Sequence, residues 1–161
     1  MRLIDSNTDF YNRNHNRIDI AQVKAENYLK SKNIYFKSIG FDSKDDKIPS
    51  DMFFSIPSFF RCMPDLIVYY NGLTYFMEIK GCRNTVKIKI DDIKNYERWN
   101  TIMPLKIFIF SNTKNKAYSI RIDHIYNQYD NCSFSRYNDN NKLYIEIPVD
   151  RLEKYELKIN V

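Results

Sequence analysis

The chain has few of the side chains from which zinc sites and disulfide frameworks are built. It contains only three cysteines, Cys62, Cys82 and Cys132, together with two histidines, His15 and His124, and no CxxC pair. Closely spaced Cys and His residues are typical of structural zinc sites, and even sets of cysteines are typical of small secreted domains. The sequence favours neither, so we expect three reduced thiols in a cytoplasm-like compartment.

Long apolar segments are also missing. No apolar run reaches the roughly 18 residues that a membrane-spanning helix needs, and Met1 to Asp5 lack the apolar stretch of a secretory signal. We therefore expect a soluble intracellular protein with no membrane partner. Asn, Ile, Lys and Tyr are frequent, which indicates AT-rich coding DNA as in low-GC bacteria and their phages. The expected location is the cytoplasm, or for a phage protein the host cytoplasm or the virion.

The residues that are abundant indicate a folded domain with affinity for polyanions. A length of 161 residues is enough for one core without staples, and 43% hydrophobic and 16% aromatic residues argue against disorder. We predict a single domain over residues 1–161, with a core at about 19–110 and a C-terminal extension at 111–161. The net charge of +5 and the pI near 9.0 permit nucleic-acid binding.

The order of local patterns predicts an α/β or α+β fold around a mixed sheet. A helix is expected over residues 19–31 with Asp19 as its N-cap, and a short strand at 34–36 follows it. Residues 42–57 are charged and contain two prolines, which favours an irregular loop. Aromatic residues in and after this loop either line a substrate groove or pack onto the core; they are Phe53, Phe54, Phe59 and Phe60.

The strongest local signal is a β-hairpin around Asn71-Gly72. This dipeptide separates two β-rich runs, Asp65–Tyr70 and Leu73–Lys80, and Asn-Gly between such runs favours a type I′ turn. Apolar residues occupy both faces of the two runs, which is typical of central strands covered on both sides.

Further elements are expected after the hairpin. The segment 86–90 alternates apolar residues with lysines, and Asp91 or Asp92 can cap a helix that ends before Pro104. Two more strands are predicted at 105–110 and 117–122. An Asn-rich turn and the strand after it predict a final C-terminal β-hairpin, with the turn at 138–141 and the strand at 143–147.

The hairpin brings two acids and a lysine together. Pairing Tyr70 with Leu73 and continuing that register places Asp65 opposite Glu78, where like charges about 4.5–5.5 Å apart at Cβ repel. A hard divalent cation such as Mg²⁺, which prefers oxygen ligands, would relieve this repulsion. Lys80 returns to the same face as Glu78 because strand side chains alternate. Two acids, a metal and a lysine are suited to phosphodiester hydrolysis.

Pro64-Asp65 and Glu78-Ile79-Lys80, whose acids are thirteen positions apart, resemble the signature of the PD-(D/E)XK nuclease superfamily. The resemblance covers about residues 19–110 and implies a restriction-endonuclease-like αβββαβ core, with helices flanking the mixed central sheet.

The same resemblance implies roles for individual residues. Asp65, Glu78 and Lys80 would be catalytic, and Mg²⁺, or Mn²⁺ as a substitute, would be bound by Asp65, Glu78 and the backbone carbonyl of Ile79. Members often carry another acid on the first helix, and Glu26 is the matching residue here. A solvated helix-face glutamate is the alternative for Glu26. No small-molecule cofactor is implied.

Several cations near this centre are candidate phosphate ligands: Arg61, Arg83, Lys87, Lys89 and Lys94. The alternative is an ordinary solvated surface, because Asp91, Asp92 and Glu97 interrupt the run. Trp99 is expected in the core, since it follows Ile93 and Tyr96 at helical spacing, rather than as a platform for bases.

The implied function is hydrolysis of duplex or branched DNA by an endonuclease in recombination, junction resolution, repair or phage DNA processing. A small domain without an appended recognition domain favours structure-directed cutting. Holliday junction resolvases of this superfamily act as symmetric dimers, so a homodimer is one expectation. Two alternatives stay open: a nuclease-fold DNA-binding or virion component with weak or dispensable cleavage, and an RNA-processing nuclease. The intact Asp65, Glu78 and Lys80 argue against the first alternative.

Overall fold

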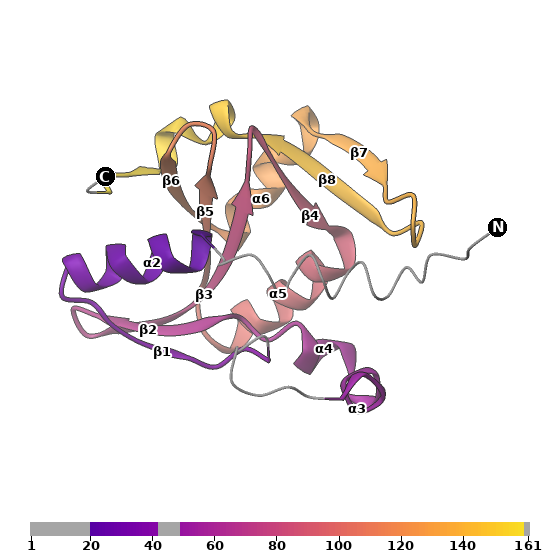
Figure 1. Cartoon of the computed structure of the whole chain (residues 1–161), viewed down its shortest axis with the longest axis horizontal. Helices are drawn as coiled ribbons and strands as arrows, with labels where there is room; N and C mark the ends of the chain where they lie inside the picture. Colours follow the sequence, from indigo (N-terminus) through magenta and orange to yellow (C-terminus); the bar gives the residue numbers. More distant parts are fainter. Residues whose placement is uncertain (1–19, 42–48, 160–161) are drawn as a thin grey trace.

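A mixed sheet forms the centre of the molecule (Figure 1). The computed structural model describes residues 20–41 and 49–159, and within them the sheet has six strands. Strands β3 and β5 are parallel, whereas all the other neighbouring pairs are antiparallel. In spatial order the strands are β1 (Tyr35–Ser38), β2 (Leu66–Tyr70), β3 (Leu73–Cys82), β5 (Leu105–Ser111), β6 (Lys116–Arg121) and β9 (Glu156–Leu157).

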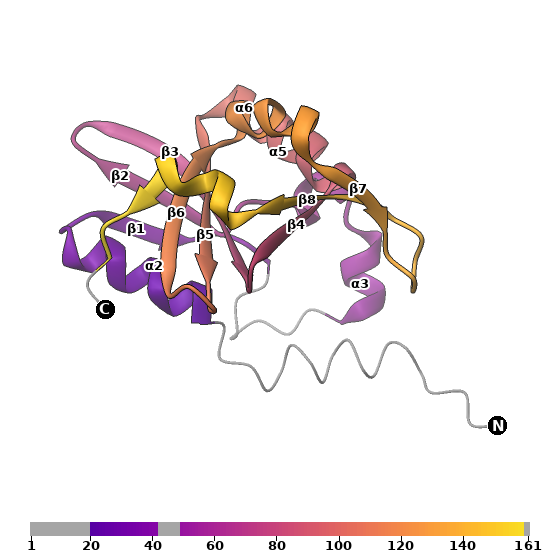
Figure 2. The ribbon, with the colours of Figure 1, turned by 90° about the horizontal axis from the view of Figure 1, so that it is seen from above.

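Helices cover both faces of this sheet, as Figure 2 shows: α2 lies on one side, and α5 and α6 lie on the other. Helix α2 (Ile20–Ser31) buries Ala21, Ala25 and Leu29, which share one face at a spacing of four residues. They pack with apolar residues of β2, β3 and β5. The predicted α+β fold with a mixed sheet flanked by helices is therefore confirmed. The predicted N-cap, Asp19, lies outside the described residues.

The second large helix, α5 (Ile90–Ile102), begins two or three residues earlier than a cap at Asp91 or Asp92 predicts. Its N-cap is Lys89, which makes no side-chain capping bond, so the predicted cap at Asp91 or Asp92 is wrong. Both acids instead lie in the first turn, where negative charge stabilises the positive end of the helix dipole. The apolar face of α5 is buried as predicted, and the helix ends at Ile102, before Pro104.

The β2–β3 hairpin forms in the predicted register, with Tyr70 paired to Leu73. Asn71 and Gly72 have φ angles of 49° and 78°, and positive φ at both central positions defines a type I′ turn. Strand β3 is central, because β2 and β5 are its neighbours in the sheet. It also continues two residues beyond Lys80, to Cys82.

The segment between β1 and β2 is more regular than predicted. Residues 42–48 lie outside the described part of the chain, but two short helices follow them where the sequence predicts an irregular loop: α3 (Ser50–Ser55) and α4 (Ser58–Arg61). The prolines interpreted as breakers are the N-cap residues of these helices, Pro49 and Pro57. Proline is tolerated at a helix start, because no backbone N–H is needed there for the helix.

A second sheet packs beside the first, in the order β4 (Thr85–Lys89), β8 (Leu143–Pro148), β7 (Ser133–Arg136). The predicted C-terminal hairpin is therefore confirmed as β7–β8, and β4 adds to its edge. Three elements that the sequence did not predict connect the two sheets: α6 (Ile122–Ile125) and the 3₁₀ segment η1 (Tyr126–Asn131) lead from β6 to β7, and the 3₁₀ segment η2 (Val149–Tyr155) leads from β8 to β9. One apolar cluster joins α5, the second sheet and the α5-facing side of the main sheet.

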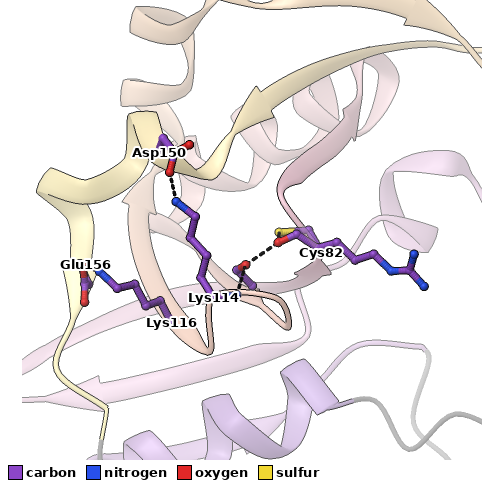
Figure 3. A network of polar contacts seen from close by, with 7 residues as sticks. Cys82, Lys114, Lys116, Asp150 and Glu156 are labelled. Atoms are coloured by element: carbon purple, nitrogen blue, oxygen red, sulfur yellow. Dashed lines mark hydrogen bonds and ion pairs between the residues drawn. The ribbon is translucent and has the colours of Figure 1, made fainter.

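Polar contacts attach the C-terminal segment to the β5–β6 turn and to the start of β6 (Figure 3). Lys114 pairs with Asp150 of η2, and Lys116 Nζ lies 2.7 Å from Glu156 Oε2 of β9. Exposed pairs of this kind contribute at most about 1 kcal/mol each, so the buried apolar cluster supplies most of the attachment. No helix among residues 20–41 and 49–159 is long and apolar enough to cross a membrane.

Candidate active site

The end of the β2–β3 ladder brings Asp65 to β3. The paired residues end at Leu66 and Met77, and Asp65 immediately precedes Leu66. Its carboxylate oxygen Oδ2 accepts a hydrogen bond from the backbone N–H of Ile79 at 2.6 Å. The register predicts Asp65 opposite Glu78. In the structure, the Asp65 side chain is held against β3, the strand of Glu78, by its hydrogen bond to Ile79.

Glu78 is a buried acid, with 7% of its surface exposed. Its Oε1 atom accepts one hydrogen bond from Lys80 Nζ at 2.6 Å and another from the Tyr96 hydroxyl at 2.6 Å. A buried carboxylate is costly unless it is paired and hydrogen-bonded. The lysine on its own strand and the tyrosine on α5 meet that requirement, so Glu78 faces α5 and not α2.

Lys80 is a cation in this environment. Burial is the largest single influence and lowers the pKa of its ammonium group, but Glu78 and Tyr96 together outweigh it and raise the pKa well above its usual 10.5. Tyr96 keeps its proton, because burial and the nearby Glu78 raise the pKa of its hydroxyl well above the usual value despite the opposing charge of Lys80. Lys80 is therefore suited to stabilising negative charge and not to accepting a proton.

Gly40 allows the chain after β1 to lie directly against Asp65. The backbone N–H groups of Ile39 and Gly40 donate to the Asp65 carbonyl oxygen at 3.0 and 3.3 Å. A Cβ atom on Gly40 would lie 3.2 Å from Asp65 Cα and 3.5 Å from Asp65 Oδ1. The missing side chain thus leaves space beside the acid. Sequence reasoning missed this residue, because a lone glycine outside a turn pattern carries no distinctive signal.

The donor set at this site fits a hard cation. Among the described residues, no group of three or more His, Cys, Asp or Glu side chains is placed to hold a metal ion. Mg²⁺ does not require one, since it keeps several waters and uses one or two carboxylates. Asp65 and Glu78 provide carboxylate oxygens at the end of the hairpin, and Gly40 leaves space beside Asp65 Oδ1.

Glu26 belongs to the helix on the opposite side of the sheet from the Glu78 side chain. Within the described chain its carboxylate contacts neighbours on its own helix: Gln22 Nε2 donates to Oε1 at 2.8 Å, and Lys30 Nζ lies 3.7 Å from Oε2. Helix α2 packs on the sheet face opposite to the one from which Glu78 contacts α5. The structure does not bring Glu26 together with Glu78, and its catalytic role stays a prediction.

The predicted phosphate-binding cations differ in their surroundings. Lys87 Nζ lies 3.3 Å from Glu146 Oε1 and 3.3 Å from the Tyr144 hydroxyl, so its charge is partly compensated. Lys89 Nζ lies over the ring of Tyr137 at 5.8 Å. Arg83, on the β3–β4 connection, and Lys94, on α5, are exposed. Arg61 lies among aromatic rings of α3.

No family model matches the chain, and the search of curated proteins returns no match. Several solved structures align with the chain, and two of them align over most of its length. A Holliday junction resolvase from Archaeoglobus fulgidus aligns over 84% of this chain and 92% of that chain, with 9% identity and a TM-score of 0.48. A nuclease from a fusselovirus aligns over 97% of this chain and 88% of that chain, with 8% identity and a TM-score of 0.45. Similarity at this level assigns neither a family nor a function.

Proposed function

We propose that this protein is a Mg²⁺-dependent endodeoxyribonuclease of the PD-(D/E)XK type. It would hydrolyse phosphodiester bonds in DNA that it recognises by structure and not by base sequence. One observation carries the proposal: at the end of the β2–β3 hairpin the Asp65 carboxylate accepts a hydrogen bond from the backbone N–H of Ile79, the residue between Glu78 and Lys80, and the buried Glu78 carboxylate is bonded to Lys80. Two acids at paired strand positions repel each other and destabilise a sheet, which favours a cation bound between them.

Each side chain has a defined part in this proposal. Asp65 and Glu78, with the backbone carbonyl of Ile79, would hold Mg²⁺, which supplies Lewis-acid stabilisation of a phosphate and lowers the pKa of water. The Lys80 ammonium neutralises negative charge that develops on the phosphate during the reaction. Tyr96 holds the Glu78 carboxylate in place through its hydroxyl. The net charge of +5 favours encounter with the DNA backbone.

The decisive experiment compares several labelled substrates side by side with Mg²⁺ or Mn²⁺: linear duplex, single strand, flap, four-way junction and RNA. We expect cleavage of DNA that stops when EDTA is added, together with a preference for one of the branched or partly single-stranded forms. Asp65→Asn is the matched control, because an amide oxygen can still accept the Ile79 hydrogen bond while the ligand charge is removed. Cleavage in excess EDTA, or cleavage by Asp65→Asn at the wild-type rate, would show that the proposed metal site is not the active site.

Two other outcomes have clear meanings. Binding of DNA without cleavage under any metal would indicate a nuclease-fold binding component. Cleavage confined to RNA would indicate an RNA-processing nuclease. Sedimentation of the same preparation reports whether the chain forms the homodimer that paired cuts on a symmetric junction require.

A further inference from the structure

The α3–α4 segment, residues 50–61, exposes large apolar side chains. Met52, Phe54 and Phe60 are 57%, 70% and 46% exposed. Isolated exposed apolar residues are common, but several within one short segment mark an interaction surface. The segment lies at the edge of the molecule next to α5, away from β7 and β8 in the view of Figure 1.

Arginines lie among these rings. The Arg61 guanidinium carbon is 5.5 Å from the ring centroids of both Phe53 and Phe54, and that of Arg98, on α5, is 4.2 Å from the centroid of Phe59. Neither arginine forms an ion pair with an acid in the part of the chain that the structure describes. Their positive charge is therefore available to an anionic ligand.

The segment is fixed to the helix that supports the candidate active site. The ring of Phe59 stacks on Trp99 with centroids 4.4 Å apart and planes at 12°. Trp99 Nε1 also donates a hydrogen bond to the Phe59 carbonyl oxygen at 3.1 Å. Trp99 lies on α5, as does Tyr96, so the exposed rings are held on a rigid support.

The segment is also close to the two acids along the chain. Arg61 precedes Asp65 by four residues, which limits their Cα separation to about 14 Å. Cys62, next in sequence, donates from Sγ to Asp92 Oδ1 at 3.7 Å. Burial raises the pKa of the Cys62 thiol, and the charges of Asp92 and Glu78 contribute to this rise. A phosphate held by Arg61 would therefore lie within about four stacked nucleotides of Asp65, at roughly 3.4 Å each.

We propose that α3 and α4 form a binding site for unpaired bases of DNA, in which Phe54 and Phe60 stack on bases while Arg61 and Arg98 contact phosphates. Exposed aromatic rings beside uncompensated cations are the combination by which proteins bind single strands without reading their sequence. The inference rests on the proposed function and narrows its substrate to DNA that is single-stranded within a few nucleotides of the cut.

Binding is measured in the Asp65→Asn background, so that cleavage does not interfere, with a short labelled single strand and the duplex of the same sequence. The test variant is Phe54→Ala combined with Phe60→Ala. We expect it to bind the single strand about 5- to 150-fold more weakly for each base that no longer stacks on a ring, with the duplex affinity unchanged. Replacing both residues by Trp, which also stacks, should retain the binding of the single strand.

The matched control is Tyr35→Ala combined with Leu73→Ala, because these residues are 67% and 70% exposed and lie in the β1–β3 part of the sheet. This control should bind both DNAs like the Asp65→Asn parent. Unchanged single-strand affinity in the test variant, or an equal loss in the control, would overturn the proposal. So would a shift from dimer to monomer in sedimentation with DNA binding intact, which would indicate a surface for a second copy. Since no step requires cleavage, an inactive wild-type enzyme would count against the proposed function alone.

Discussion

The hydroxyl of Tyr96 donates a hydrogen bond to Oε1 of Glu78 at 2.6 Å. The bond joins α5 to β3 inside the protein, and it is one of two that compensate the buried acid. A residue that sequence periodicity assigns only to the apolar face of a helix therefore also positions a proposed metal ligand.

We expect Tyr96→Phe to lower the free energy of unfolding by about 1.5–3 kcal/mol, the range for a hydrogen bond to a charged group. The proposed cleavage should slow as well, because the substitution removes one of the hydrogen bonds that hold Glu78 in place. Urea unfolding and single-turnover cleavage measure the two effects.

Tyr118 supplies the control for this prediction. Its hydroxyl is also buried, but it has no hydrogen-bond partner among the described residues. Tyr118→Phe removes an unsatisfied polar group, so we expect unchanged or increased stability. If the free energy of unfolding falls equally in Tyr96→Phe and Tyr118→Phe, the effect at Tyr96 comes from packing and not from its hydrogen bond to Glu78.

A second prediction concerns the charge of Lys80. Burial is the largest single influence and lowers the pKa of Lys80, but Glu78 and Tyr96 together outweigh it, so that the pKa lies well above 10.5. A raised pKa in the folded state means that the ion pair contributes fully below the unfolded pKa and is lost only as the pH rises through the folded pKa. The stability difference between wild type and Lys80→Met should therefore be constant from about pH 7 to pH 10.

The same reasoning separates two chemical roles for Lys80. A permanent cation stabilises charge and does not act as a general base at neutral pH. Lys80→Arg should thus retain measurable cleavage, whereas Lys80→Met should reduce the rate by about 100-fold or more. Two results together would contradict a cationic role for Lys80. The cleavage rate would fall equally in Lys80→Arg and Lys80→Met, and the stability difference between wild type and Lys80→Met would already decrease near pH 8.

A third prediction contrasts two substitutions at Asp65. Relief of like-charge repulsion, taken alone, predicts that Asp65→Ala increases the free energy of unfolding. The structure adds the bond from the Ile79 N–H, so Asp65→Ala should be less stable than Asp65→Asn by about 1 kcal/mol in urea unfolding. Both should be inactive with Mg²⁺. Equal stability would show that the bond to Ile79 does not contribute to folding, and activity in either would exclude Asp65 as a ligand.

Much of the site could be predicted because it depends on local rules. The Asn71-Gly72 turn fixes the register of the hairpin, and that register places Asp65 beside the strand of Glu78 and Lys80. Strand alternation then determines which residues share a face. The same local reasoning predicted the burial of Trp99, which is 7% exposed.

What could not be predicted depends on contacts between distant parts of the chain. The bond from Tyr96 to Glu78 requires α5 to cross β3 at one particular position, and nothing in the helical pattern specifies this. The approach of Gly40 to Asp65 depends on how β1 pairs with β2. The prolines at 49 and 57 were interpreted as breakers because the same residue type both interrupts helices and begins them.

The last prediction separates two cations that the sequence treats as equivalent. Arg83 is exposed and has no ion pair among the described residues, whereas Lys87 is paired with Glu146. Arg83→Ala should reduce the magnitude of the slope of log affinity against log salt concentration by about 0.9 for duplex DNA, the value for one phosphate contact. Lys87→Ala should change this slope less, because the lysine already has an acidic partner. The slopes are measured in the Asp65→Asn background, with Lys80→Ala as the comparison. If Lys80→Ala flattens the slope while Arg83→Ala leaves it at the parental value, Lys80 holds the backbone and Arg83 does not.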